Sequence, residues 1–415
     1  MPVDLTVLQA RRDRTLREHL SKDRGVGKAM DLFREKASGY GFRHRRDLLA
    51  GALRLNRSMA PTVSAALAEC REILGVTTPI EVFVRPDAMF GAFAAKNPAG
   101  PVMIGLTSRL IESFSPTELK FVIGHELGHV AFDHFGIPMP ITATIEDVGG
   151  ALVSRPTQLE LFVWCRAAEV SADRAGFVCA RDEEVATRAF FKLASGVATD
   201  VIRPDLGAFV KQVESIASAP AARVEDRDDD DMLDCFSTHP YTPSRVRALL
   251  AFARSTTYRS LTGLGKGDVD AAALEAVVER DLALMEPTYL EEKGPTSDLM
   301  RRLLYCAGVS VAAVTGGISD VEQSALRALL GERESQAPSK LDDVKRELEE
   351  KLDVANREVA LAGRMQLVQH LTVIAAADGV VDREEHAEIS RISGRLGVDA
   401  RIVEETLRGA AAPMD

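Results

Sequence analysis

The sequence predicts an α+β protein that is mostly α, with a small antiparallel sheet in its first third and an all-α C-terminal domain. Helical patterns fill most of the chain, β-rich texture is confined to one short region, and a helical motif occurs twice near the C-terminal end. At 415 residues the chain is too long for one ordinary core, so we divide it into regions 1–75, 76–290 and 293–415.

The composition restricts the classes of partner. With 51 Lys and Arg against 62 Asp and Glu, the net charge is −11, which argues against nucleic acid because phosphate contacts need clustered cations. No apolar run approaches the roughly 18 residues that a membrane-spanning helix needs, and residues 1–20 lack the apolar core of a signal peptide. Five cysteines without a paired spacing favour reduced thiols, so we expect a cytoplasmic protein without a transmembrane segment.

Residues 1–75 predict helices throughout, and Gly75 is expected to end the last of them. After Gly75 the pattern of residues changes from helical to β-rich. Three segments rich in β-branched and aromatic residues are separated by Pro86 and by the turn at 97–100, which predicts an antiparallel meander. The three predicted strands are 80–85, 90–96 and 101–106.

A well-marked helix start follows the predicted sheet, after a short helix around 107–114. The segment SPTE at 115–118 combines a capping box with proline at the first helical position. We expect this helix to run to about Phe135, where Gly136 and Pro138 would stop it.

The next region predicts further helices, expected at 155–180, 183–195 and 269–286. The run EDRDDDD at 225–231 is typical of a solvated loop, with a cation site as the alternative. The Pro- and Gly-bearing break at 286–298 is the best-marked domain boundary in the chain.

The stretch IGHELGHVAF, inside the helix that starts at Pro116, carries a metal-binding pattern. His125 and His129 are four residues apart, so they project from one face of the helix and can share one Zn²⁺. Glu126 leans toward the same place without ligating and can take a proton from water as it attacks a carbonyl. Gly128 removes a side chain where a neighbouring element can pack closely.

A catalytic zinc needs a third protein ligand and an open fourth position. The spacing HExxHxxGxxH is excluded here, because Phe132 and Phe135 stand where Gly and His would be needed. The following helix offers Glu169 as the third ligand. Asp173, one turn further on, can accept a hydrogen bond from a ligating histidine and so fix its tautomer.

Three motifs in this order resemble a known family. HELGH at 125–129, EVSAD at 169–173 and STHPYTPSR at 237–245 are similar to the HtpX and CAAX-prenyl-protease family of gluzincin metallopeptidases. The resemblance covers about residues 76–260. Many members of that family are integral membrane proteases, and the absence of predicted spans here implies a soluble branch.

The resemblance implies one zinc ion per chain, with His125, His129 and Glu169 as ligands and Glu126 as general base. It also implies that two residues of the HPxxxxR element lie near the metal and near the oxyanion that develops on the substrate. These two residues are His239 and Arg245. His239 either donates a hydrogen bond to that oxyanion or occupies the fourth zinc position in a resting state.

The segment FGAFA at 90–94 stands where the family usually shows Asn-Ala-Phe before the active-site helix, with Gly in place of Asn. The resemblance therefore assigns substrate binding to Gly91, Ala92 and Phe93. His134, near the end of the same helix, is expected to cap the last carbonyls, with metal binding as the alternative. The other histidines lie in charged helical contexts and are expected at the surface: His19, His44, His370 and His386.

The C-terminal region looks internally duplicated. Residues 312–331 align with 374–397 as helix, glycine turn and capped helix, which matches Asp320 with Asp382, and the linker 331–340 separates the copies. The motif ADGVVDREE lacks the first two acidic ligands of an EF-hand, so calcium binding of that kind is not expected.

Residues 296–410 as a whole resemble TerB-like helical domains of tellurite resistance proteins. Helix-turn chemistry explains the motif, with Asp382 as N-cap and Glu385 closing a capping box, and metal binding is the alternative. We expect this domain to bind a protein partner.

Together these features predict a zinc metalloendopeptidase with a regulatory or substrate-recruiting C-terminal domain. A peptide or protein substrate would add as an extended strand to the edge of the 80–106 sheet. Two alternatives are a zinc-stabilised chaperone-like or interaction protein without proteolysis, and a helical signalling module dominated by the C-terminal domain. Glu126 favours the enzyme, because a purely structural zinc has no use for a base.

Overall fold

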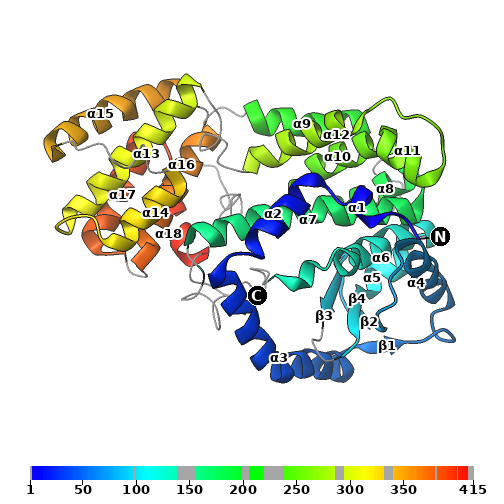
Figure 1. The fold of residues 1–415 in the computed structure, drawn as a ribbon. Helices are drawn as coiled ribbons and strands as arrows, with labels where there is room; N and C mark the ends of the chain where they lie inside the picture. The colour runs from blue at the N-terminus through cyan, green and yellow to red at the C-terminus, as the bar shows by residue number, and fades with distance from the viewer. Residues whose placement is uncertain are drawn as a thin grey trace.

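The computed structural model confirms a mostly helical α+β chain with one small sheet (Figure 1). It describes residues 2–96, 100–137, 153, 155–198, 205–218, 238–285, 294–330, 340–359, 361–378, 381–399 and 401–409. The predicted acidic loop at 225–231 lies outside these residues. So does most of the turn at 97–100, of the break at 286–298 and of the linker at 331–340.

The N-terminal region is helical, as predicted, except for one short strand. The helices are α1 Leu5–Leu8, α2 Arg11–Leu20, α3 Arg24–Gly51 and α4 Pro61–Leu74. Gly75 ends α4 in the left-handed conformation with φ 68°. The strand β1, Leu53–Leu55, was not predicted, because three residues carry too little alternation to reveal a strand that is defined by its partner β2.

The sheet is mixed, so the predicted antiparallel meander is wrong. Its other strands are β2 Ile80–Arg85, β3 Ala92–Lys96 and β4 Val102–Thr107. The order is β1-β2-β4-β3, with β2 parallel to β4 and β3 antiparallel to β4. The run VMIGL of β4 is buried along its whole length, as a central strand flanked on both faces must be, which leaves β3 at the edge.

Each face of the sheet packs against helices (Figure 1). On one face, Phe83 and Met103 contact Leu48 of α3. On the other face, Val82 and Ile104 belong to the main core, which includes α4 and α6. The sheet therefore supports α6 from one side.

The helix that carries the histidine motif begins as predicted and ends earlier than predicted. After α5, Ser108–Ser113, the capping box is formed: Ser115 N donates to Glu118 Oε2 at 2.6 Å. Helix α6 spans Pro116–Ala131 and is followed by a 3₁₀ turn, His134–Gly136. Asp133 adopts a left-handed conformation with φ 53°, which reverses the chain before Phe135.

The remaining helices of this half pack around α7. Helices α7 and α8 lie at the predicted positions, Arg155–Ala180 and Glu183–Ser195. The others are α9 Leu206–Ser218, α10 Thr242–Arg254, α11 Thr256–Thr262, α12 Ala271–Leu282 and the 3₁₀ turn Ala283–Met285. Helices α2, α6, α10 and α12 all contact α7, which is the central helix of this half.

The C-terminal helices share a core of their own. They are α13 Pro295–Val314, α14 Asp320–Leu330, α15 Leu341–Glu358, α16 Leu361–Ala375, α17 Arg383–Arg395 and α18 Arg401–Gly409, with a 3₁₀ turn at Ala376–Asp378. The Asp382–Glu385 capping box is present. The matching cap in the first copy is Ser319, whose N donates to Glu322 Oε2 at 2.8 Å, so the predicted match of Asp320 with Asp382 is one residue out of register.

Among the helices of the described ranges, none is long and apolar enough to cross a membrane. Of the four histidines expected at the surface, His370 is the exception, because it lies fully inside the C-terminal core with 1% of its surface exposed. Helix α16 carries one charged residue, Arg364, which is also buried, so His370 does not lie in the charged and exposed context that was expected.

Candidate metal centre

Two helices cross at very short range to form the site. Glycines on α6 allow this, as expected for Gly128: a Cβ there would lie 2.8 Å from Ala175 Cβ and 3.0 Å from Ala172 Cα. At Gly124 a Cβ would lie 3.0 Å from the Cα of Gly176 on α7. The backbones of α6 and α7 therefore touch, which brings the side chains on their shared face within ligand distance.

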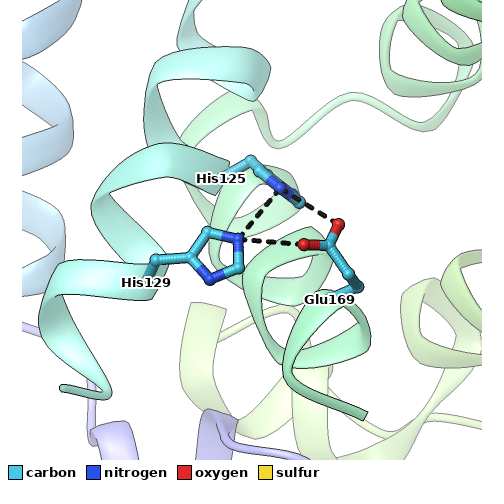
Figure 2. Close-up of side chains that lie close together, drawn as sticks. All are labelled: His125, His129 and Glu169. Atoms are coloured by element: carbon cyan, nitrogen blue, oxygen red, sulfur yellow. Dashed lines mark hydrogen bonds and ion pairs between the residues drawn. The ribbon is translucent and has the colours of Figure 1, made fainter. Parts of the chain in front are cut away.

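The three predicted ligands converge at this crossing (Figure 2). His129 Nε2 lies 3.3 Å from His125 Nε2 and 3.3 Å from Glu169 Oε1, and His125 Nε2 lies 3.4 Å from Glu169 Oε2. One ligand atom from each residue falls within 4.8 Å of the other two. Within the described part of the chain, these residues form a group that could hold one metal ion.

A carboxylate orients the first histidine, as predicted. His125 Nδ1 lies 2.9 Å from Asp173 Oδ1, so it donates to the carboxylate, and in the neutral ring Nε2 is then the atom that can bind a metal. Arg245, from α10, donates to both oxygens of Asp173, with Nε at 2.9 Å from Oδ2 and Nη2 at 2.7 Å from Oδ1. These bonds hold the pKa of the Asp173 carboxyl below its ordinary value although burial alone would raise it.

The second histidine is held differently, by residues that sequence analysis missed. His129 Nδ1 lies 2.9 Å from His134 Nδ1, and His134 Nε2 lies 3.1 Å from Asp13 Oδ2. His134 is fully buried. The expectation that it caps the end of α6 is therefore wrong, because the left-handed Asp133 turns the chain back and places the ring beneath His129. No local pattern marks Asp13, which is 121 residues from His134 in the chain.

The atoms at the crossing fit a cation. With both Nδ1 atoms used as donors, the two Nε2 atoms are lone-pair acceptors that face each other and a carboxylate. Arg245 Nη2 lies 3.1 Å from Glu169 Oε2, but this buried oxygen receives no hydrogen bond from the described residues. Although burial opposes ionisation, interactions with His239 and Arg245 hold the pKa of Glu169 well below its ordinary value. Three acceptors around one point, one of them a buried anion, are suited to bind Zn²⁺.

The acid–base candidate lies beside this group. Glu126 follows His125 on α6, is buried, and has a pKa above its ordinary value, because burial disfavours its charged form. His239 comes from the segment before α10, and its Nε2 lies 3.6 Å from Glu169 Oε1, while its side chain is 55% exposed. The structure thus brings His239 to the open side of the group, whereas Arg245 is engaged with Asp173 and Glu169 behind it.

The three residues assigned to substrate binding divide between the faces of the sheet. Gly91 precedes β3, and its N donates to Thr107 Oγ1 at 3.1 Å. Ala92 belongs to the core on the α6 side. The Phe93 ring covers Gly105 on the opposite face, with Leu48 and Met103, so the structure does not bring this side chain to the metal ligands.

Comparisons with known proteins match both halves of the chain. Residues 62–253 match the family model of peptidase family M48, and residues 302–406 match that of the tellurite resistance protein TerB. The plastoglobule-localized metallopeptidase 48 of Arabidopsis thaliana chloroplasts is 28% identical over 216 residues, which is 50% of this chain. The chain spans 61% of the length of that relative. Both resemblances expected from the sequence are confirmed at the level of the family.

Proposed function

We propose that this chain, whose residues 62–253 match the model of peptidase family M48, is a zinc metalloendopeptidase of that family. The observation that carries the proposal is the convergence of His125, His129 and Glu169 beside the buried carboxyl of Glu126. The family is zinc-dependent, and the three side chains supply the two imidazoles and one carboxylate of a gluzincin site. A structural zinc closed by four ligands would have no use for Glu126.

Zinc bound there would supply Lewis acidity to the scissile carbonyl. The remaining chemistry belongs to the chain. Glu126 takes the proton of the attacking water and passes it to the leaving amine. Burial raises the pKa of the Glu126 carboxyl above its ordinary value, which favours uptake of a proton by this group.

Two residues of the HPxxxxR element complete the proposed site. His239 lies on the exposed side of the ligand group, where it can donate to the developing oxyanion or block the fourth zinc position at rest. Arg245 does not face the substrate: its positive charge lies between Asp173 and Glu169 and reduces the repulsion between these two buried carboxylates.

The edge strand β3 is the proposed place for substrate. In the sheet order it is the last strand, and it pairs with β4 on its inner side. Lys96, at its end, forms an ion pair with Asp133 in the turn after α6, so the strand is tied to the ligand helix at 3.1 Å. An extended peptide that adds to β3 would run past α6, bound by backbone hydrogen bonds, with Gly91 and Ala92 at the start of the strand.

The C-terminal helices are proposed as a separate regulatory or recruiting domain, 293–415, next to a peptidase domain, 76–290, and the N-terminal helical region, 1–75. Support comes from their self-contained core and from the TerB match. The two halves meet at α7 and at a long hydrogen bond from Gln366 Nε2 to Leu284 O at 3.5 Å.

The test is to profile a mixed peptide library by mass spectrometry with zinc-loaded wild type beside Glu126→Gln. The substitution keeps the size of the side chain and removes the base, so cleavage should fall by at least about 10²-fold. Equal cleavage by both proteins would assign the activity to another site. No cleavage by wild type, with zinc bound, would favour a zinc-stabilised interaction protein instead.

A further inference from the structure

The two histidine ligands have unequal support. His125 is oriented by Asp173 of the neighbouring helix α7. His129 is oriented by another histidine, His134, which lies on the turn after its own helix. A neutral imidazole can lie in either tautomer, so His134 can fix His129 only if something fixes His134.

Asp13 fixes it. The carboxylate of Asp13 accepts from His134 Nε2 at 3.1 Å, so the proton of His134 is on Nε2 and its Nδ1 is an acceptor. Because His134 Nδ1 accepts, His129 Nδ1 must donate to it across 2.9 Å. His129 Nε2, the atom nearest Glu169, is then free of a proton.

The other partners of Asp13 also donate hydrogen bonds to its carboxylate. Trp164 Nε1 donates to Oδ1 at 3.0 Å, and Ser171 Oγ donates to Oδ2 at 2.7 Å. The backbone N of Ala10 donates to Ser171 Oγ at 3.0 Å, which commits the hydroxyl proton of Ser171 to Asp13. Gln9 Nε2 also donates to Oδ2, at 2.9 Å. All four side chains around this fully buried carboxyl therefore act as donors, which favours its ionised form. The pKa of Asp13 is accordingly below its ordinary value: burial opposes this, and His134 and Ser171 outweigh it.

The same helix also holds the turn that carries His134. Arg17, one helical turn after Asp13 on α2, donates to Asp133 Oδ2 at 2.8 Å. Asp133 is in a left-handed conformation, which is unfavourable for a residue with a Cβ and needs outside support. Helix α2 lies along α7 and so reaches the turn from the side opposite the sheet (Figure 1).

We propose that Asp13, acting through His134, is a positioning residue for the metal ligand His129. Helix α2 is thereby part of the metal centre, although it lies outside residues 62–253 that match the peptidase family. This proposal depends on the proposed function in one respect, which is that the bound ion is zinc. It explains why a charged side chain of the N-terminal region is buried with no ion pair to Lys or Arg among the described residues.

The test is the zinc affinity of the full-length protein, measured by competition with a chromophoric chelator. In Asp13→Asn the charge is lost, and either orientation of the amide points its NH₂ group at a buried donor, so the tautomer of His134 is held less firmly. We expect zinc binding about 10–100-fold weaker, the usual effect of losing such a partner. In His134→Phe a similar loss is expected. Because Asp13 acts through His134, the double variant should bind zinc no more weakly than His134→Phe alone.

A matched control separates this effect from general loss of stability. Asp281→Asn makes the same change at a buried carboxylate of α12, which is paired with Arg247 at 2.7 Å and touches no proposed ligand. It should lower the melting temperature and leave zinc affinity unchanged. Equal zinc affinity in wild type and Asp13→Asn, or losses that add in the double variant, would overturn the proposal and leave the proposed function standing. Wild type that binds no zinc would refute the proposed function itself.

The wild-type protein offers a second measurement in case the variants do not fold. Long-range ¹H–¹⁵N NMR of the histidine rings distinguishes the two tautomers. We expect the proton of His134 on Nε2 and that of zinc-bound His129 on Nδ1. A proton on Nδ1 of His134 would contradict the proposal.

Discussion

Arg245 donates two hydrogen bonds to Asp173, and the same carboxylate accepts a hydrogen bond from the ring N–H of His125, a proposed metal ligand. The distances are 2.9 Å for Arg245 Nε to Oδ2, 2.7 Å for Nη2 to Oδ1, and 2.9 Å for His125 Nδ1 to Oδ1. Asp173 is buried. The ion pair thus ties α10, which follows the HPxxxxR histidine, to a ligand on α6.

Asp173→Asn should weaken both the fold and the metal centre. Removing one partner leaves Arg245 as a buried charge without its main counter-ion, which costs about 3–5 kcal/mol of unfolding free energy. Zinc affinity should fall by about 10–100-fold. The control is Asp268→Asn, which breaks the exposed ion pair with Arg254 and should change stability little, because water and salt screen that pair. Similar losses in the two variants, measured by chemical denaturation, would contradict this reading.

Gly128→Ala should force α6 and α7 apart. The added Cβ would lie 2.8 Å from Ala175 Cβ, a distance that requires the backbone to move. We expect a loss of about 1–3 kcal/mol in stability and weaker zinc binding, because Glu169 moves away from the histidines. Gly394→Ala, in the last turn of α17 with open space around it, should instead be neutral or stabilising by up to about 1 kcal/mol. If both glycines tolerated alanine equally, close packing would not be what forms the site.

His239→Ala distinguishes the two proposed jobs of this residue by sign. If His239 donates to the oxyanion, kcat should fall by about 10²–10³-fold while zinc binding is kept. If His239 blocks the fourth zinc position at rest, basal cleavage should rise. Peptide cleavage and zinc affinity measured together decide between these outcomes. No change in either would remove the segment 238–245 from the active site.

His370 should make the C-terminal core sensitive to acid. Burial lowers the pKa of His370 to about 4, whereas the unfolded chain has the ordinary value near 6.5. Between these values the unfolded state binds the extra proton, so stability falls as pH falls, by about 2 kcal/mol from pH 7 to pH 5. His370→Gln should show a correspondingly flatter dependence in denaturation experiments. The matched control is His19→Gln, since the His19 side chain is 67% exposed. An unchanged slope in His370→Gln would show that the ring is not buried as a neutral group.

Local chemistry predicted the elements that depend on neighbouring residues. The capping box at Ser115 fixed the start of α6, and Gly75 ended α4, because both signals act within one turn. The order of strands was not predictable in this way. The segments 80–85 and 101–106 pair in parallel. This pairing depends on the arrangement of all the strands around β4, which is buried on both faces, and no neighbouring residue signals it.

The residues of the candidate site also fall into those that local sequence signals reveal and those that they do not. His125, His129 and Glu169 could be found because helical spacing and an ordered set of motifs mark them. Asp13 and His134 could not, because their roles depend on a left-handed residue and on a helix packed from far along the chain. His370 was expected at the surface, but residues 364–376 are buried on every face of the chain there, because α16 lies inside the C-terminal core.

The most direct test of the account is the zinc content of purified, zinc-incubated and desalted protein, measured by elemental analysis. We predict one zinc per chain in wild type and in Glu126→Gln, because the base is not a ligand, and almost none in His129→Ala. A wild-type chain that stays free of zinc, or a His129→Ala variant that keeps a full equivalent, would contradict the claim that His125, His129 and Glu169 form the metal centre.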